Sequence, residues 1–381
     1  MIAKSSSSVA YCQVYNFEVK MIEKDELVSF HKKGEKTGVI FTSMIVGGHE
    51  IMTLAIIEQI LTDNPECLSE IILYIPFDNA ALIDKVKKKG YQYQVFFVAH
   101  RRMEIVHAFL NFKFLGECAK ALKKVKAEND HIVLVQGDIQ QGSGFIIASK
   151  LTGTTLTSYI PFAHSYKVMN APGYKIKDTL ANVIYRMCNE YITISSCFKD
   201  DLLLLNPKAS VHLIKNSVPK STKKYISKCL GKEDVINIFI IGRVHIQQKG
   251  HDILIDALKN IYDYKIRLNI VGDGPDRDTV IAKAETLPPN ITLKYFGWVD
   301  DSWSVADSAN VLVIPSRYEG VPLVMLEAIE RGLPVVAVAR DGMKDYLPAD
   351  WLYAPGDDES EALKLKLSEI FHKITDMENY N

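Results

Sequence analysis

The chain of 381 residues is long enough for two domains of ordinary size, each with its own hydrophobic core. Its hydrophobic content of 48% and charged content of 24% are typical of a soluble globular protein, and its net charge of −1 gives no global reason to expect nucleic-acid binding. The six cysteines lack paired spacing, which predicts reduced thiols and not a disulfide framework or a zinc site. No apolar run approaches the roughly 20 residues that a spanning helix needs, so we expect a cytoplasmic protein whose membrane contact is at most peripheral.

The first 36 residues precede the regular strand pattern and form a separate N-terminal extension. Within them Tyr15, Phe17, Val19 and Met21 alternate with polar residues. Because such alternation is typical of a half-exposed strand, it predicts an added edge strand.

From residue 38 onward, short apolar strands alternate with helical stretches, which predicts parallel sheets in an α/β protein. The first series of strands is expected at residues 38–44, 71–76, 94–98, 132–136, 155–160 and 191–194. A second series begins with a strand at residues 211–214, which leads into a lysine- and serine-rich linker at residues 220–232, and continues at residues 236–241, 267–271, 292–296, 311–314 and 335–337. The pattern predicts two doubly wound, Rossmann-like domains at residues 37–218 and 219–381 that face each other across a cleft, with ligands beyond the carboxyl ends of the strands.

A pair of glycines, Gly47 and Gly48, follows the first strand of this series and precedes an amphipathic helix. Paired glycines let backbone N–H groups approach an anion closely. The next two residues, His49 and Glu50, either cap the helix or touch a substrate.

Residues 100–126 mix basic and apolar residues at helical spacing. This composition is typical of a membrane-surface helix and equally of an ordinary amphipathic helix with a solvated lysine face. The neutral balance of the whole chain favours the second interpretation.

Two polar positions follow later strands of the first domain. Asp138 is the only acid of a glycine-rich loop at residues 137–144, where it either contacts an acceptor or forms a turn. His164 follows the strand at residues 155–160, where it serves either a structural or a ligand-binding role.

In the second domain, Arg243 and Lys249 bracket the loop that follows the strand at residues 236–241. If this loop folds back, the two cations converge above the sheet, where they would stabilise the negative charge that a leaving diphosphate gains. The alternative is that both are solvated surface residues.

Two further turns follow strands in this domain. Gly272 opens a tight Gly-Asp-Gly-Pro turn that either contacts a ligand or only reverses the chain. Gly297, Trp298 and Val299 follow the strand at residues 292–296, and Trp298 either lines a nucleobase pocket or packs in a core.

The most informative segment places Glu319 and Glu327 around the start of a helix. Gly320 and Pro322 open this helix after the strand at residues 311–314, and Gly332 ends it. One carboxylate therefore lies in a loop above a strand and the other about two turns into a helix. Carboxylates that bind hydroxyls, next to helix-start amides that bind phosphate, predict a cradle for a sugar nucleotide.

The block from Ser316 to Ala337 resembles the E-x7-E motif of the retaining glycosyltransferases of family 4, glycosyl transferases group 1, which have the GT-B fold. The resemblance extends from residue 38 to about residue 370. It implies transfer of a sugar, with retention at the anomeric carbon, from a nucleoside-diphosphate donor to a hydroxyl acceptor. UDP-sugars are the expected donors; the acceptor could be a polysaccharide, a lipid-linked sugar, a protein or a small molecule.

The resemblance also implies roles for individual residues. Those expected at the reacting groups are Arg243, Lys249, Glu319 and His164. Those expected at the donor nucleotide are Glu327, Gly320, Val321, Pro322, Leu323, Gly47, Gly48, Gly272, Gly297, Trp298 and Val299. His49 and Asp138 are expected on the acceptor side.

Metal independence is expected, with no cofactor. No Asp-x-Asp follows a strand, and Arg243, Lys249 and helix dipoles can neutralise the charge of a diphosphate.

The chain departs from the family at both ends. Residues 1–36 are added, and only seven residues follow a helix at residues 359–374, which puts the family's crossover helix in doubt. Two alternatives remain, a non-catalytic GT-B subunit that binds a protein partner and a sugar-nucleotide epimerase, which would need catalytic acids in the cleft that the sequence does not reveal.

Overall fold

The computed structural model describes residues 22, 24–98, 101–225, 230–231 and 233–375. Contacts divide them into two compact units. The N-terminal unit holds the described residues up to Ser217 together with Tyr318–Leu323, and the C-terminal unit holds Val218–Arg317 and the described residues from Val324 onward. The edge strand predicted at residues 15–21 lies outside the described residues.

The N-terminal unit is built on a seven-stranded parallel sheet with the strand order β3-β2-β1-β4-β5-β6-β7. The central strands are apolar and buried, because helices cover both faces of the sheet. The strands are β1 Thr37–Phe41, β2 Ile71–Pro76, β3 Tyr93–Phe96, β4 His131–Val135, β5 Thr157–Tyr159, β6 Glu190–Thr193 and β7 Ser210–Leu213.

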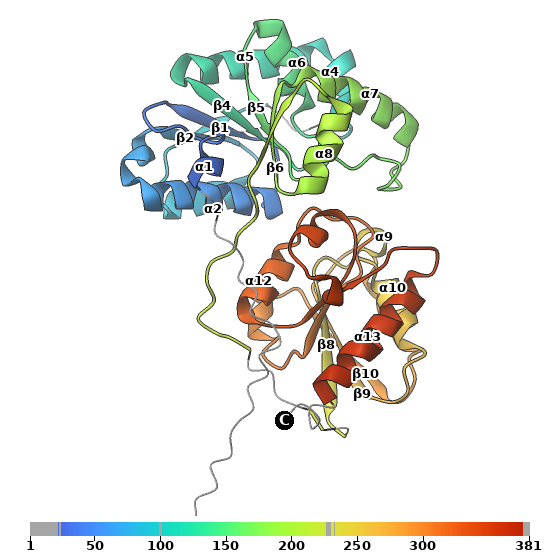
Figure 1. The fold of residues 1–381 in the computed structure, drawn as a ribbon. Coiled ribbons are helices and arrows are strands. Elements are labelled where there is room, and N and C mark those ends of the chain that lie inside the picture. The colour runs from blue at the N-terminus through green and yellow to red at the C-terminus, as the bar shows by residue number, and fades with distance from the viewer. Residues whose placement is uncertain (1–21, 23, 99–100, 226–229, 232, 376–381) are drawn as a thin grey trace, which may run out of the picture. The chain divides into compact units, whose positions relative to one another are not determined.

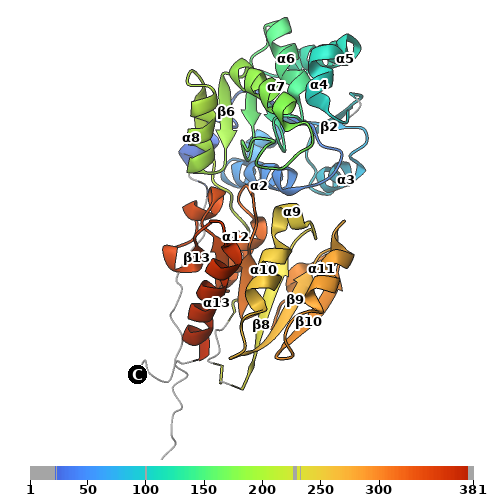
Figure 2. The same cartoon turned by 90° about the vertical axis from the view of Figure 1, so that its right-hand side faces the viewer.

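Figures 1 and 2 show α4, α5 and α6 on one face of this sheet and α2 on the other. The core on the α4–α6 side contains Ile40, Phe114, Leu134 and Phe145. The helices of this unit are α1 Lys24–Leu27, α2 Gly48–Asp63, η1 Pro65–Ser69, α3 Ala80–Lys88, α4 Glu104–Leu110, α5 Phe112–Glu128, α6 Ser143–Thr152, α7 Tyr174–Met187 and α8 Ser196–Leu205.

The C-terminal unit has a six-stranded parallel sheet with the order β10-β9-β8-β11-β12-β13. Its strands are β8 Val235–Ile241, β9 Lys265–Val271, β10 Ile291–Gly297, β11 Val311–Ile314, β12 Val335–Val338 and β13 Leu352–Tyr353. Figure 1 shows α12 on one side of this sheet and α10 and α13 on the other. The helices are α9 Ile246–Lys249, α10 His251–Leu258, α11 Arg277–Ala284, η2 Ser302–Ser304, α12 Leu323–Arg331, η3 Asp341–Asp345, η4 Ala349–Trp351 and α13 Glu359–Thr375.

Every strand predicted from residue 38 onward is present, with ends that differ by at most three residues. The sequence missed β13, whose two residues are too few to carry a periodic pattern. Two parallel α/β sheets of Rossmann-like type confirm the predicted fold class.

Each sheet has one place where the strand order reverses, between β1 and β4 and between β8 and β11. Ligands of such sheets bind beyond the carboxyl ends of the strands at this place, because the loops there diverge to opposite faces. The loops at residues 42–48 and 136–142, and those at residues 242–250 and 315–322, follow these four strands.

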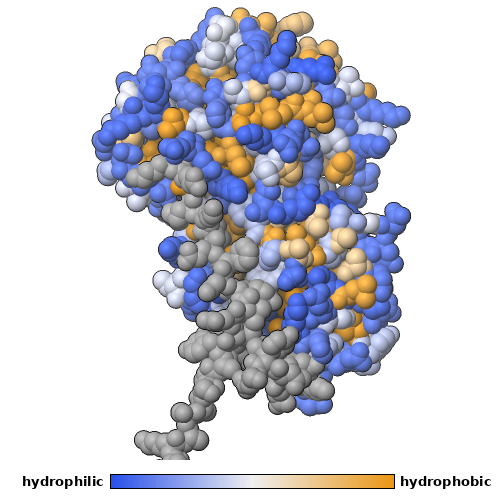
Figure 3. Space-filling model, in the orientation of Figure 1, coloured by the Kyte–Doolittle hydropathy of each residue, from blue (hydrophilic) through white to orange (hydrophobic). Residues whose placement is uncertain are grey.

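The face drawn in Figure 3 carries apolar side chains in small groups among hydrophilic ones. Leu110, at the end of α4, and Phe112, at the start of α5, are 75% and 83% exposed, and farther along α5 the lysines 120, 123, 124 and 126 are exposed. Among the described helices, none has the length and apolarity to cross a bilayer. Peripheral membrane contact through residues 100–126 stays a prediction, and His100 lies outside the described residues.

Candidate functional site

The loop after β8 folds back on itself, which brings Lys249 over the end of the strand. The amide of Val244 donates to the carbonyl of Asp273 at 3.0 Å, and the amide of Lys249 donates to the carbonyl of His245 at 2.7 Å. A Cβ added at Gly242 would lie 3.5 Å from Lys249 Cε and 3.8 Å from its Nζ. The ammonium group of Lys249 therefore lies near the carboxyl end of β8, where the adjoining Arg243 is exposed. Their roles stay predictions.

Glycines let the loops at this edge pack backbone against backbone. A Cβ at Gly272 would lie 2.0 Å from the carbonyl oxygen of Gly242, and one at Gly250 would lie 2.0 Å from that of Pro315. No real side chain tolerates such distances, so these glycines are required by the close approach of the loops after β8, β9 and β11. Gly272 thus has a structural role, whether or not it also contacts a ligand.

An ion pair that the sequence analysis missed joins the loop after β11 to the first turn of α10. Arg317 donates from its two terminal nitrogens to the carboxylate of Asp252 at 2.8 and 2.7 Å, and its backbone amide donates to the carbonyl of Gln248 at 2.8 Å. Burial acts to raise the pKa of Asp252, but the hydrogen bonds and charge of Arg317 outweigh burial and lower it. The backbone bond to Gln248 holds the loop of Lys249 against the loop after β11, and the bidentate pair fixes Arg317 on the first turn of α10. Arg317 and Asp252 are 65 residues apart in the chain, so no sequence pattern predicted that they pair.

A second residue missed by the sequence analysis is His251, the first residue of α10, which is only 2% exposed. Burial, and then the nearby charge of Lys249, lower its pKa to about 4. His251 is therefore neutral near pH 7, and it adds no positive charge beside Lys249.

The segment Tyr318–Leu323 packs within the N-terminal unit, although it leads into α12. A Cβ at Gly320 would lie 3.4 Å from Ile194 Cδ1, and Asn216 donates from Nδ2 to the carbonyl of Val321 at 3.4 Å. Glu319 is 8% exposed. The helix α12 begins at Leu323, directly after Pro322. Gly332, with φ of 73°, ends this helix as expected.

His164 lies next to this segment. Its Nε2 is 3.1 Å from the carbonyl oxygen of Glu319, and because a carbonyl can only accept, Nε2 carries the proton. Its ring contacts the rings of Phe162, Phe198 and Tyr318 at centroid distances of 5.5, 5.2 and 6.0 Å. The structure thus brings His164 and Glu319 together through the backbone of Glu319.

The carboxylate of Glu327 is held by a tryptophan. Trp303 donates from Nε1 to Glu327 Oε2 at 2.7 Å, and the Arg331 guanidinium lies 4.4 Å from the centre of the Trp303 ring. Burial raises the pKa of Glu327, against the opposite effects of Trp303 and Arg331. Among the described residues the other oxygen, Oε1, has no hydrogen-bond partner, so it can accept from a ligand hydroxyl.

Trp298 is 76% exposed, so the alternative that it packs in a core is wrong. It follows Gly297, whose φ of 70° turns the chain at the end of β10. Val299 is half-buried beside it. An exposed indole at a strand end can stack on a base, and this role stays a prediction.

On the N-terminal unit, the Gly47–Glu50 segment forms a helix cap. The amide of Gly47 donates to Glu50 Oε2 at 2.7 Å, and Nε2 of His49 lies 2.6 Å from Glu50 Oε1. Glu50 is fully buried, so capping is its role. Gly48 is exposed, and a Cβ there would meet no atom within 4 Å. A Cβ at Gly137 would lie 2.8 Å from Cε1 of His49, so the loop after β4 contacts the first turn of α2.

Asp138 forms a turn. Its Oδ1 accepts from the amides of Gln140 and Gln141 at 3.0 Å each, which is the turn interpretation of this residue. An acceptor contact by Asp138 stays a prediction.

Near the carboxyl ends of β1 and β2, Glu104 is 5% exposed and lines a small cavity of about 20 Å³ with Thr42 and Asp78. The amide of Gly144 donates to Glu104 Oε1 at 3.3 Å. Burial raises the pKa of Glu104 from its usual 4.5 to about 8, so the residue is largely protonated at pH 7. The sequence analysis gave no role to this residue.

The pKa of Glu104 predicts a pH dependence of stability. Between about pH 4.5 and 8 the folded chain holds a proton that the unfolded chain has released. Glu104 therefore favours the folded state less and less as the pH rises through this window.

Glu104→Gln should be more stable than the parent at pH 9 by a few kcal/mol at most, and the advantage should vanish at pH 4. Thermal unfolding of both proteins across this range measures it. Glu117→Gln on α5 is the control, and a Glu104→Gln difference independent of pH would contradict the account.

Residues 236–372, less than half of the chain, match the model of a family described as glycosyl transferases group 1. Sulfoquinovosyl transferase SQD2 of Arabidopsis thaliana is 32% identical over an alignment of 131 residues, and the match covers 32% of this chain and 25% of that protein. The chain spans from 25% to 50% of the length of three curated relatives that it matches.

Two solved structures resemble nearly the whole chain. The apo form of the lipopolysaccharide outer core galactosyltransferase WaaB has a TM-score of 0.69 and 19% identity, over 89% of this chain and 91% of that chain. HepE of Anabaena in complex with UDP has a TM-score of 0.66 and 17% identity, over 89% and 90%. The fold is that of the GT-B glycosyltransferases. Within this fold, the family match to glycosyl transferases group 1 covers the residues from β8 to α13.

Proposed function

We propose that the protein is a retaining glycosyltransferase of family 4 that moves a sugar from a UDP-sugar to a hydroxyl of a glycan acceptor. The observation that carries the proposal is the position of Lys249, folded back over Gly242 beside Arg243 at the place where the strand order reverses. A diphosphate placed there would meet two cations, and its charge would be neutralised without a metal ion.

The E-x7-E block supplies the remaining donor contacts. Glu327 presents one unpaired carboxylate oxygen while Trp303 holds the other, and such an oxygen suits a ribose hydroxyl. Glu319 is proposed to bind hydroxyls of the donor sugar. The exposed indole of Trp298 provides a face for the nucleobase. UDP is the proposed nucleotide because HepE, a protein of similar fold, binds it.

The proposed reaction needs no carboxylate nucleophile. The bond between the anomeric carbon and the diphosphate breaks, a bond to the acceptor oxygen forms on the same face, and the acceptor proton passes to the leaving diphosphate. Lys249 and Arg243 stabilise the charge that develops on this leaving group. A glycan acceptor is proposed because WaaB, a protein of similar fold, is described as a lipopolysaccharide outer core galactosyltransferase.

Glu327 offers a test of the nucleotide contact that separates binding from stability. Glu327→Ala should weaken UDP binding about tenfold and also destabilise the fold by about 1–3 kcal/mol, because the Trp303 N–H would lose its acceptor. Glu327→Gln keeps an acceptor for Trp303, so it should weaken UDP binding while leaving the unfolding temperature close to that of the parent. Calorimetric titration with UDP and thermal unfolding measure the two effects, and parental UDP affinity in both variants would contradict the ribose contact.

The proposed activity is tested by incubating the protein with a panel of UDP-sugars and glycan acceptors. Release of UDP should depend on one UDP-sugar, and NMR of the product should show the anomeric configuration of the donor. An inverted product would refute the retaining mechanism, and nucleotide binding without turnover of any donor would favour a non-catalytic GT-B subunit.

A further inference from the structure

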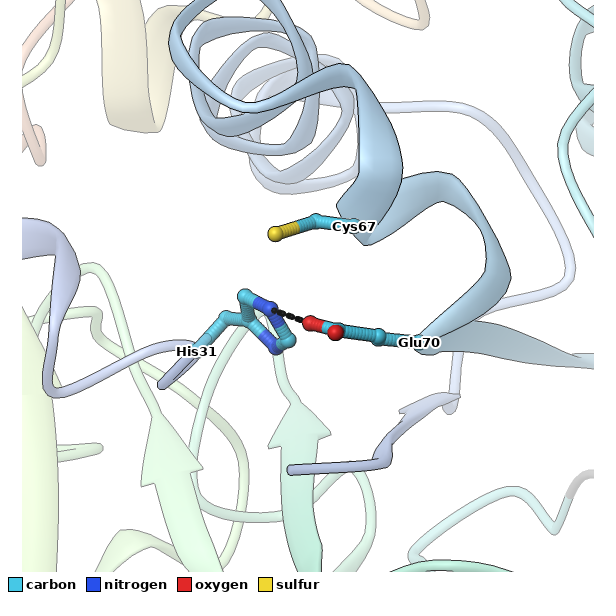
Figure 4. Close-up of side chains that lie close together, drawn as sticks. All are labelled: His31, Cys67 and Glu70. Atoms are coloured by element: carbon cyan, nitrogen blue, oxygen red, sulfur yellow. Dashed lines mark hydrogen bonds and ion pairs between the residues drawn. The ribbon is translucent and has the colours of Figure 1, made fainter. Parts of the chain in front are cut away.

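A cluster of three metal-ligating side chains lies at the amino edge of the N-terminal sheet, away from the loops described above. His31 precedes β1, Cys67 lies in η1, and Glu70 immediately precedes β2. Figure 4 shows the three side chains turned toward one another from these three segments. Their nitrogen, sulfur and oxygen atoms all lie within 4.8 Å of one another.

We propose that His31, Cys67 and Glu70 bind a zinc ion. Imidazole, thiolate and carboxylate are the ligands that Zn²⁺ takes in proteins, at about 2.0–2.3 Å. Tetrahedral geometry at these lengths separates two nitrogen or oxygen ligands by about 3.3 Å. Nε2 of His31 and Oε2 of Glu70 are 3.1 Å apart, so this pair already has the required spacing.

Charge and burial suit a divalent cation. Cys67 is fully buried and His31 is 5% exposed, whereas the Glu70 side chain is 22% exposed. Thiolate and carboxylate together supply two negative charges, which Zn²⁺ cancels in a buried place where a net charge would be costly. The partial exposure of Glu70 leaves a side from which water can supply the fourth ligand.

Neighbouring groups can orient the ligands. His31 Nδ1 lies 2.9 Å from Thr37 Oγ1, and the amide of Gly34 donates to Glu70 Oε2 at 3.1 Å. Because a hydroxyl both donates and accepts, Thr37 can accept a hydrogen bond from Nδ1–H, and the tautomer with its single ring proton on Nδ1 leaves Nε2 bare for the metal. Zinc then displaces one proton, the thiol proton of Cys67, while the neutral imidazole keeps its proton on Nδ1.

Such an ion would fasten the segment before β1 to the segment before β2. The sequence analysis predicted no zinc site, because His31 and Cys67 are 36 residues apart and match no motif. The fold alone brings them together.

The test uses the full-length, untagged protein, freed of metal and titrated with Co²⁺ and then Zn²⁺. One equivalent of Co²⁺ should produce thiolate-to-metal absorption, which Zn²⁺ should displace, and elemental analysis should then find one zinc per chain. Cys67→Ser should abolish this absorption and His31→Gln should weaken binding, while Thr37→Val should weaken it about 10- to 100-fold. Cys197→Ser on α8 and Glu66→Gln next to the cluster are matched controls that should behave as the parent.

The proposal is overturned if the folded parent shows no thiolate absorption with Co²⁺, which leaves a hydrogen-bonded cluster only. It is equally overturned if the absorption survives in Cys67→Ser, because another thiol would then bind the metal. If Cys67→Ser does not fold, His31→Gln and Thr37→Val decide by the same measurements. UDP binding is measured on each variant and should be unchanged, so failure of the zinc site and failure of the proposed glycosyltransferase remain distinguishable.

Discussion

Lys249→Ala should lower turnover about 100- to 1,000-fold while the protein stays folded. The physical reason is that the ammonium group lies near the end of β8 and, in the proposed mechanism, stabilises charge that appears on the leaving diphosphate only as the glycosidic bond breaks. One such contact is worth about 3–4 kcal/mol of transition-state stabilisation. The measurement is the rate of UDP release from the donor that the parent turns over.

The matched control is Lys265→Ala, which removes an exposed lysine from the amino end of β9 in the same sheet. Lys265 pairs with Glu233 at 2.6 Å, far along the strand from the loop of Lys249, so its loss should leave turnover unchanged. Parental turnover in Lys249→Ala would contradict the role assigned to this lysine, and equal losses in both variants would indicate a non-specific effect of charge.

Gly250→Ala should destabilise the protein by about 3 kcal/mol or more, the second large effect that we expect. Gly250 has φ of 65°, and its added Cβ would lie 2.0 Å from the carbonyl oxygen of Pro315, a backbone atom. The loop after β8 would have to move away from the loop after β11, and Lys249 would move with it. Chemical denaturation measures the free energy of unfolding, and UDP release measures the loss of activity.

Gly153→Ala separates the steric effect from the effect of the backbone conformation. Gly153 has φ of 67°, close to that of Gly250, but its added Cβ would meet no atom within 4 Å. Gly153→Ala should therefore cost only about 1 kcal/mol and keep full activity. Equal destabilisation by the two substitutions would show that the close approach to Pro315 contributes nothing.

The fold was predictable from the sequence because the buried strands of parallel sheets are apolar runs between helices. Strands such as β2 and β11 were located to the residue, since turn or helix signals bound them on both sides. The short β13 was not found. The packing of Tyr318–Leu323 within the N-terminal unit was not foreseen either, because it depends on contacts of Gly320 and Val321 with residues more than 100 positions away.

Within the candidate site, local patterns succeeded and distant contacts failed. The sequence placed Arg243 and Lys249 in one short loop and made their convergence depend on that loop folding back, which the position of Lys249 over Gly242 shows. The pairs Arg317–Asp252 and Trp303–Glu327 join residues 65 and 24 positions apart, so no spacing rule could predict them. Glu104 and His251 were missed because burial, which shifts their pKa values, is a property of the folded chain.

The central claim is a metal-independent nucleotide site that depends on Lys249. The most direct test is thermal unfolding of the parent and Lys249→Ala with UDP, GDP, ADP or dTDP, each with and without EDTA. A ligand that binds only the folded state stabilises it by about 2.7 kcal/mol at 100 times its Kd. We expect UDP to raise the unfolding temperature of the parent, by the same increment with and without EDTA, and to do so much less in Lys249→Ala. An increment that EDTA abolishes, or the absence of any increment with all four nucleotides, would contradict this account.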